Sequence, residues 1–295
     1  MLFRSAVNSV ATFTNLGITG STGNSYTITY SVTYNSTVIS TQQSSISITY
    51  GDEAKLAITT QAAGFVNRTD FTTQPVVEIR DSADNKVANS TANVTISIDS
   101  GTLTGANKTV AAINGVATFA GIGKTGTIGS KTLTFSSGSL ATDSQTFTLT
   151  FGAATQVALT ATATLVNDTV MSTQPVATIQ DADGNTVTSG ADATQTVTLT
   201  STNATISGTT SMAAVGGVAD FAGKGVKLRG LIGARNLTAT ITSPSTITGT
   251  TSVTITYGAA TRVVLTTQAA GFVNRTDFTT QPVVQIQDVS GNVVA

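Results

Sequence analysis

Hydrophobic and polar residues alternate along most of this chain. Leu56 and Ile58 have small or polar neighbours on both sides, and Val157 and Leu159 follow the same rule further along. A period of two places every second side chain on one face of a β-strand. Further alternating positions are Val94, Ile96 and Ile98; Ala117 and Phe119; Leu133 and Phe135; and Phe147, Leu149 and Phe151. Three more pairs are expected to point into a core: Val77 with Ile79, Ala177 with Ile179, and Val284 with Ile286. No stretch of about 11 residues or more carries a helical stripe, so the sequence predicts an all-β fold.

The strands are expected to form pairs of sheets that pack face to face. Alternation buries one face of a strand and exposes the other, so each sheet needs a second sheet against its apolar face. Thr and Val, which are abundant in this sequence, favour the pleated surface of a sheet. We therefore expect sandwiches that contain about seven short strands each.

One sixteen-residue motif occurs three times. It reads TTQPVVEIRDSADNKV at 72–87, STQPVATIQDADGNTV at 172–187 and TTQPVVQIQDVSGNVV at 279–294. The spacing is 100 residues from Gln74 to Gln174 and 107 residues from Gln174 to Gln281. Self-similarity at such a spacing is typical of a tandem array. One repeat is therefore about 100 residues long.

An aromatic residue followed by glycine marks the boundary between repeats, in the runs TYGDEAKLAI, TFGAATQVAL and TYGAATRVVL. This register gives the C-terminal half of one repeat (1–50), two complete repeats (51–151 and 152–257) and the N-terminal part of a further repeat (258–295). We expect each complete repeat to form one immunoglobulin-like sandwich, arranged end to end with its neighbours. We interpret the sequence as a section of a longer array. The alternative is that half-repeats of different molecules complete each other by exchanging strands.

The repeated motif is expected to open a strand and to end in a tight turn. The strand begins beside a proline, whose missing N–H costs least at the start of a strand. These prolines are Pro75, Pro175 and Pro282. The turn that follows has Asp84, Gly184 and Gly291 in one column. This column indicates a positive φ angle, which glycine adopts without strain and aspartate less readily.

Charge excludes several classes of partner. Charged residues make up 10% of the chain, against roughly 25% in ordinary soluble domains. Fourteen basic and fifteen acidic residues, with no basic run, leave no electrostatic footprint for nucleic acid or for an anionic membrane. No apolar run approaches the roughly 18 residues of a membrane span. We therefore expect neither nucleic-acid binding nor membrane insertion within this segment.

The absence of three residue types excludes much catalytic chemistry. The chain contains no Cys, no His and no Trp. Nucleophilic triads that use histidine, thiolate or imidazole zinc sites and disulfide frameworks all need one of the first two. No pair of carboxylates recurs in both complete repeats, so acid–base catalysis is not expected either. The sequence does not predict an enzyme.

Asp181, Asp183 and Asn185 form the one candidate metal site. Their sequence, DADGN, is similar to the first part of an oxygen-rich calcium loop. Ala83 and Ser290 replace Asp183 in the sister turns, and no glutamate follows at the twelfth loop position. The alternative is an Asx-turn, which uses the same leading aspartate. Calcium is the only cofactor that this site suggests.

Nine Asn-x-Ser/Thr triplets are potential glycan acceptors. The asparagines are Asn35, Asn67, Asn89, Asn93, Asn107, Asn167, Asn203, Asn236 and Asn274. The abundance of Asn, Ser and Thr accounts for most of these triplets, so the motif alone does not establish glycosylation.

Several motifs together resemble a known class of repeat. The run D-x-x-G-N-x-V is followed by a strand rich in Val and Thr (NVTISI, QTVTLT), then by GTLTG, GVATF and TLTF. This order resembles the bacterial immunoglobulin-like repeats of the invasin and intimin type and related arrays in giant bacterial surface proteins. The resemblance covers both complete repeats and both halves. Asp84-Asn85 replaces Gly-Asn in the first complete repeat, a departure that concerns the turn geometry only.

The resemblance implies a bacterial immunoglobulin-like sandwich in a stalk or adhesin at the cell surface, outside the cell. The function expected is that of a non-catalytic structural spacer, whose partners are the neighbouring repeats. Any cell-surface glycan or receptor would be contacted by a module outside this segment. Two alternatives remain: a glycan- or receptor-binding repeat, and a fibre or decoration protein of a bacterial virus.

Overall fold

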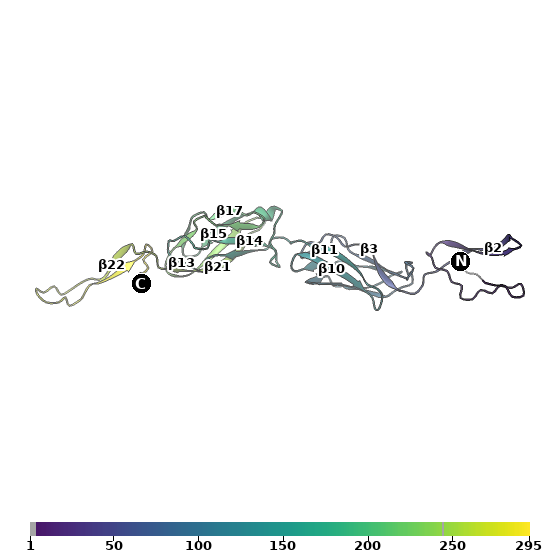
Figure 1. The fold of residues 1–295 in the computed structure, drawn as a ribbon. Helices are drawn as coiled ribbons and strands as arrows, with labels where there is room; N and C mark the ends of the chain where they lie inside the picture. The colour runs from purple at the N-terminus through teal and green to yellow at the C-terminus, as the bar shows by residue number, and fades with distance from the viewer. Residues whose placement is uncertain (1–3, 244) are drawn as a thin grey trace. The chain divides into compact units, whose positions relative to one another are not determined.

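The chain forms two compact units. The computed structural model describes residues 4–243 and 245–295. The units are Met1–Thr150 and Phe151–Ala295 (Figure 1). Each unit contains one complete repeat, folded as a sandwich, and one partial repeat, and we describe each unit by itself.

The sandwich of the first unit has seven strands in sheets of three and four. The first sheet has the order β3 (Lys55–Thr60), β4 (Val76–Arg80), β8 (Val116–Thr118). The second has the order β11 (Asp143–Leu149), β10 (Gly129–Ser136), β5 (Asn93–Ile98), β7 (Thr109–Ala111). A separate pair consists of β6 (Thr102–Thr104) and β9 (Gly123–Thr125). All of these neighbouring strands are antiparallel.

The apolar faces of these two sheets form the core. Val77 and Ile79 of β4 are fully buried, as are Leu133 and Phe135 of β10. The ring centroids of Phe135 and Phe119 are 5.6 Å apart. Burial of one such side chain contributes about 1.5–3 kcal/mol. The alternation in the sequence therefore places its apolar set between the sheets, as predicted.

The sandwich of the second unit repeats this plan. Its first sheet has the order β12 (Gln156–Thr160), β14 (Val176–Gln180), β18 (Val218–Asp220). Its second has the order β13 (Thr164–Val166), β21 (Ile247–Thr256), β20 (Gly233–Ile241), β15 (Thr196–Ser201), β17 (Ser211–Ala213). The remaining pair is β16 (Thr205–Ser207) with β19 (Lys227–Arg229), and a short 3-10 helix spans Ala191–Thr194. Ile179, Leu199, Phe221 and Leu237 are fully buried between the sheets.

Both sandwiches have immunoglobulin-like topology. Seven strands are common to both sandwiches: in order along the chain, the first, second and fifth form one sheet, and the third, fourth, sixth and seventh form the other. In the second sandwich, the short strand β13 joins the edge of the larger sheet as an additional strand. This arrangement places strands A, B and E in one sheet and strands C, F and G in the other, as in the immunoglobulin plan, with the remaining strand at the edge of the C-F-G sheet. The predicted fold class is confirmed.

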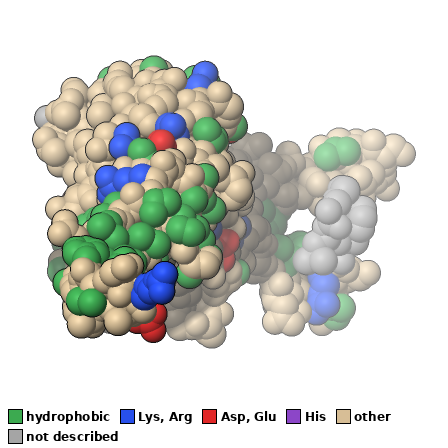
Figure 2. Space-filling model, turned by 90° about the vertical axis from the view of Figure 1, so that its left-hand side faces the viewer, with side chains coloured by type: hydrophobic (Ala, Val, Ile, Leu, Met, Phe, Trp, Pro, Cys, Tyr) green, Lys and Arg blue, Asp and Glu red, His purple; other side chains and the backbone are tan. Residues whose placement is uncertain are grey.

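Each partial repeat forms one two-stranded antiparallel sheet. β1 (Ser25–Tyr34) pairs with β2 (Thr37–Ser47), and β22 (Arg262–Thr267) pairs with β23 (Val283–Gln287). Val284 and Ile286, expected to point into a core, are 58% and 52% exposed, because no described strand forms a second sheet over them. Figure 2 faces the side on which Figure 1 labels β22, and it shows apolar side chains gathered on the surface in front.

The predicted turn chemistry is confirmed. Asp84, Gly184 and Gly291 have φ angles of 69°, 81° and 88°. Strands β4, β14 and β23 each begin at the residue after the proline of the repeated motif. The described residues include no helix long and apolar enough to cross a membrane.

We predict that protease removes the partial repeats first. Residues 4–50 and 259–282 are mostly exposed, whereas the strands of the sandwiches bury half of their side chains. Brief digestion with a protease of broad specificity, followed by mass spectrometry, should leave a product that spans about 54–256. The exposed loop at Lys108, inside a complete sandwich, is the control for accessibility alone. Ends that survive as long as the sandwiches would contradict the prediction.

Candidate functional site

The candidate site is a densely hydrogen-bonded turn formed by residues 288–292, here called the junction turn. The Asp288 carboxylate at its start is fully buried. Its Oδ1 accepts hydrogen bonds from the backbone N–H groups of Ser290 (2.9 Å) and Asn292 (3.0 Å). Its Oδ2 accepts from Gly258 N, Asn292 Nδ2 and Asn167 Nδ2, each at 2.8 Å. Five N–H donors therefore satisfy this one carboxylate.

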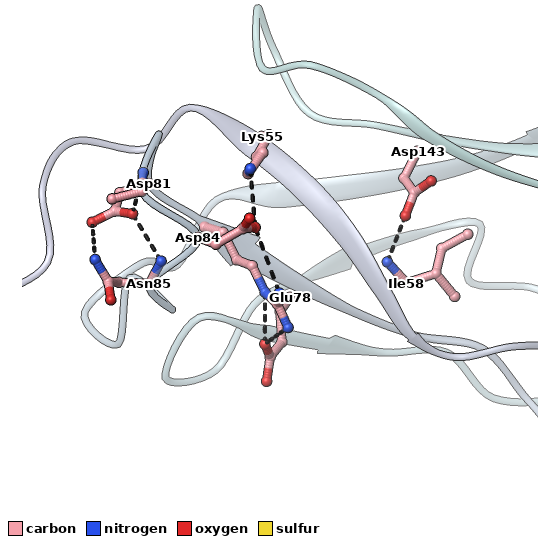
Figure 3. A network of polar contacts seen from close by, with 9 residues as sticks. Lys55, Ile58, Glu78, Asp81, Asp84, Asn85 and Asp143 are labelled. Carbon is pink, nitrogen blue, oxygen red and sulfur yellow. Dashed lines mark hydrogen bonds and ion pairs between the residues drawn. The ribbon is translucent and has the colours of Figure 1, made fainter. Parts of the chain in front are cut away.

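The other two copies of the motif form the same turn. Asp81 accepts bonds from the backbone of Ala83 (2.9 Å) and Asn85 (2.8 Å) and from Asn85 Nδ2 (3.0 Å) (Figure 3). Asp181 accepts from the backbone of Asp183 and Asn185, both at 3.0 Å. The D-x-x-G/D-N pattern is therefore an Asx-turn, in which an aspartate side chain bonds the backbone that follows it.

The same carboxylates fix the start of each repeat. Asp81, Asp181 and Asp288 accept the N–H of Gly51, Gly152 and Gly258 at 2.8, 2.9 and 2.8 Å. The last glycine also lies against the preceding sandwich, since a Cβ there would be 2.7 Å from the carbonyl oxygen of Asn167. The aromatic-glycine boundary thus marks where the entering chain meets the turn.

Asn167 connects the junction turn to the preceding sandwich. It follows β13, and its Oδ1 accepts the N–H of Gly230 at 2.9 Å. Its Nδ2 donates to Asp288 and to Ser290 Oγ at 2.8 and 2.9 Å. The Asn167 side chain is 3% exposed. One amide therefore bonds both to its own repeat and to the next.

Asn292 forms the second connection. Its Nδ2 donates to the carbonyl of Gly230 at 3.0 Å, and its Oδ1 accepts the N–H of Ile232 at 2.9 Å. Arg229 adds a bond from its guanidinium to the carbonyl of Val289 at 3.3 Å. Both ends of the junction turn therefore bind the end of the sandwich that precedes it.

The first unit repeats the Asn292 contact. Asn85 Nδ2 donates to the carbonyl of Gly20 at 3.0 Å, and Asn85 Oδ1 accepts the N–H of Thr22 at 2.8 Å. In the aligned repeats, the run GSTG from Gly20 corresponds to GLIG from Gly230. The same asparagine thus binds the same loop of the preceding repeat in both units.

The hydrogen bonds to the turn carboxylates lower the pKa of Asp81 and Asp288. The pKa of Asp81 falls from 3.8 to about 2, chiefly through the N–H of Gly51 and then through Asn85. Burial by itself would raise the pKa of Asp288, but the N–H groups of Gly258, Asn292 and Asn167 outweigh it and hold this pKa below its ordinary value. The docked turn therefore requires the ionised carboxylate.

The candidate metal site coincides with the turn of the second complete repeat. Asp181 Oδ1 accepts from Asp183 N, Asn185 N and Asn185 Nδ2. Its Oδ2 accepts from Gly152 N and Asn185 Nδ2. Both oxygens face N–H donors, which disfavour a cation, and the described residues contain no group of three His, Cys, Asp or Glu side chains that could hold a metal ion. The geometry is that of the Asx-turn, and calcium here stays a prediction without support from this arrangement.

Two of the predicted glycan acceptors lie at the ends of the sandwiches and are buried. Asn67 is 1% exposed, and its Oδ1 accepts the N–H of Gly126 at 3.1 Å. A glycan on Asn167 would displace the bonds of its Nδ2 to the junction turn. Glycosylation stays a prediction at the exposed positions, which are Asn35, Asn89, Asn93, Asn107, Asn203, Asn236 and Asn274.

Sequence reasoning missed the residues that receive the turn. Asn67 and Asn167 share a column of the repeats, and so do Gly20 and Gly230. The signal was present in these columns, but we interpreted the asparagines only as glycan acceptors. Their binding role depends on contacts that join residues about 60 to 120 positions apart.

Comparison with known proteins gives structural neighbours only. No family model matches the chain, and no curated protein is similar to it in sequence. Similar solved structures include invasin, a bacterial integrin-binding protein, which is 14% identical over 83% of this chain and 49% of its own, with a TM-score of 0.34. The Yersinia pseudotuberculosis adhesin InvE is 16% identical over 73% and 65%, with a TM-score of 0.30.

A third neighbour is an enzyme, the β-glucuronidase of Parabacteroides merdae. It is 17% identical over 39% of this chain and 14% of its own, with a TM-score of 0.27. The chain therefore spans less than two thirds of the length of each of these three proteins. Invasin and an adhesin are among the neighbours, as the sequence resemblance led us to expect. Structural similarity at these TM-scores gives no evidence about function.

We predict that Asn292→Ala loosens the junction turn. The substitution removes the acceptor of the Ile232 N–H and the donor to the Gly230 carbonyl. Loss of a buried polar partner costs about 1–3 kcal/mol, so the Ile232 amide should exchange with solvent roughly tenfold faster or more. Hydrogen exchange followed by NMR measures this rate. Asn236→Ala, on an exposed position of β20, is the matched control, and unchanged protection of Ile232 would contradict the contact.

We also predict that acid weakens the turns. The pKa of Asp81 is depressed in the fold, so its contribution to stability is complete above the unfolded value of about 3.9. That contribution is lost as the pH falls toward the folded pKa of about 2. Thermal unfolding of the full chain should show that Asp81→Asn lowers stability at pH 6 and that the difference shrinks between about pH 4 and pH 2. Asp52→Asn, at an exposed position, is the control, and a difference that does not vary with pH would refute the role of the charge.

Proposed function

We propose that this chain is a non-catalytic spacer of a bacterial surface protein, outside the cell. In this role, consecutive immunoglobulin-like repeats hold another module at a distance from the surface. The partners of each repeat are its neighbours in the same chain. In this proposal, the array is one part of a larger surface protein.

The observation that carries the proposal is the docking of one turn on the preceding repeat. Asn85 and Asn292 bind the same loop in the two units, at Gly20 and Gly230. Directional bonds restrict how one repeat is oriented on another more than a flexible linker does. A spacer needs such restriction, because a freely jointed chain of domains would not keep its ends apart.

The surface composition is consistent with this role. The outer faces of the larger sheets consist mainly of Thr and Ser, as in the row formed by Thr200, Thr238 and Thr250 across three strands. These side chains hydrate well and carry no charge. A chain in which charged residues make up 10% of the sequence provides little electrostatic attraction to other macromolecules.

The same rows support a second candidate, a repeat that binds glycans. Thr95 and Thr109 face each other on the first sandwich, and Thr198 and Ser211 do so on the second, with hydroxyl oxygens 2.9 and 3.1 Å apart. Such rows offer regularly spaced donors and acceptors on both complete repeats. A binding array would gain avidity from each copy.

Deletion of one repeat distinguishes the two candidates. Removal of residues 152–257 from the full-length surface protein joins Phe151 to Gly258 and keeps the aromatic-glycine boundary intact. A spacer should lose reach but keep the adhesion of its tip, measured as bound cells and as distance to the bound surface. A glycan-binding array should lose avidity. Deletion of residues 100–205, of equal length but out of register, is the control, because it divides two sandwiches.

Location is tested by brief protease treatment of intact source cells with mass spectrometry of the released peptides. Peptides from 51–257 together with further repeats are the expected result. Their absence from treated cells, with recovery from purified virus particles, would overturn the surface spacer in favour of a virion fibre.

A further inference from the structure

A polar hollow lies where the junction turn meets the end of the second sandwich. Its volume is about 620 Å³, within the range of roughly 300–1,000 Å³ that is typical of small-molecule sites. Residues 203–205, residues 229–231 and Ser290 line it. The first two segments belong to the sandwich, whereas Ser290 belongs to the partial repeat that follows. The hollow is therefore complete only when the junction turn is docked.

Contacts within the protein fix the walls of this hollow. The antiparallel pair β16 and β19 holds the two sandwich segments beside each other. Gly230 packs closely on the first segment, since a Cβ there would lie 3.2 Å from Ala204 Cβ. The Asn167 side chain joins the opposite wall, because it bonds both Gly230 N and Ser290 Oγ at 2.9 Å. These walls need no ligand to hold them, and a preorganised site costs less to occupy.

Arg229 gives the hollow a positive charge. Its side chain is exposed at the end of β19. Its guanidinium donates to the carbonyl of Val289 at 3.3 Å, a bond that uses one of its five N–H donors. A guanidinium can bind a carboxylate through two parallel N–H bonds. An anion in the hollow can therefore bind Arg229 while the contact with the junction turn is kept.

The carboxylates next to the hollow have other partners. Asp168 pairs with Lys227 at 2.8 Å, and Asp288 is enclosed by the five N–H donors described above. Arg235 adds a second positive charge at the same end of the sandwich, where its guanidinium donates to the carbonyl of Leu231 at 2.8 Å. Charge complementarity therefore favours an anionic ligand.

The rest of the lining favours a sugar over a bare anion. Asn203, Thr205 and Ser290 supply an amide and two hydroxyls, groups that both donate and accept hydrogen bonds. Sugar hydroxyls need partners of both kinds. Leu231 is 60% exposed and offers an apolar wall to the carbon atoms of a sugar ring. A hexuronic acid matches these features, because it has a carboxylate, several hydroxyls and an apolar ring face.

We propose that this hollow binds a carboxylated sugar, such as the hexuronic acid of an acidic polysaccharide, and that the bound sugar strengthens the docking of the junction turn. Arg229 binds the carboxylate, and Ser290 bonds the ring from the next repeat. A ligand that binds only the docked state stabilises that state. The site is separate from the threonine rows. It is a property of the purified chain, so its test can fail without affecting the proposed spacer.

The first complete repeat provides an internal reference. Thr125, paired with Thr102, stands where Arg229, paired with Thr205, stands in the second. The corresponding place in the first sandwich therefore lacks the guanidinium that the proposed site requires.

The test titrates the full 295-residue chain, made in a host that does not glycosylate it, with methyl glucuronide. NMR follows the backbone amides. Methyl glucoside supplies the same ring without the carboxylate, and acetate supplies the carboxylate without the ring. We expect methyl glucuronide to shift the amides of 203–205, 229–231 and 290 and to leave those of 102–104 and 123–125 unchanged. Neither comparator should shift them at the same concentration.

Variants identify the groups that bind. Arg229→Ala should weaken binding by about tenfold or more, because it removes a charge-assisted pair. Arg229→Lys keeps the charge but loses the planar fork, so it should also weaken binding. Arg275→Ala removes the same charge from an exposed loop of the partial repeat and should bind as the parent does. With the site saturated, the Ile232 amide should exchange several times more slowly, because its bond to Asn292 opens less often.

Four results would overturn the proposal. Methyl glucuronide that shifts none of these amides refutes the site. Equal binding of methyl glucoside refutes the role of the charge, and equal binding of acetate shows a site for bare anions only. Unchanged binding by Arg229→Ala refutes the assigned anchor. Unchanged exchange of Ile232 in the saturated protein refutes the strengthening of the junction turn.

Discussion

The structure of each repeat depends on one buried carboxylate surrounded by N–H donors. The Asp288 carboxylate cannot be buried away from water without hydrogen-bond donors, because an unpaired buried charge costs several kcal/mol. Its donors come from the turn itself, from Gly258 at the start of the repeat and from Asn167 of the repeat before. Turn, entry point and neighbour must therefore be in place together. The tight turn of one repeat thereby becomes the contact surface for another.

Apolar contacts stabilise each sandwich of this array, whereas polar contacts join one repeat to the next within a unit. The cores of the two sandwiches are closed sets of apolar side chains, each drawn from the two sheets of one repeat. The contacts described between a repeat and its neighbour within a unit are hydrogen bonds, made mainly by Asn, Asp and backbone groups, with one bond each from Arg229 and to Ser290. Stability should then be a sum of large terms for each sandwich and smaller terms for each contact. Orientation, by contrast, depends on the smaller terms, because hydrogen bonds are directional.

The sequence by itself determined the all-β class, the length of the repeat, the inward residues of the sandwiches and the positive φ of the turn. Each of these follows from local or periodic rules, such as the alternation at Val77 and Ile79 or the glycine at 291. Tertiary structure decided the rest. Val284 and Ile286 have the same pattern as Ala177 and Ile179, yet only the latter pair is covered by a second sheet. The role of Asn167 was also hidden, since its partner lies 121 positions away. Burial and hydrogen bonding of this kind depend on which distant segments come together, and no local pattern encodes that.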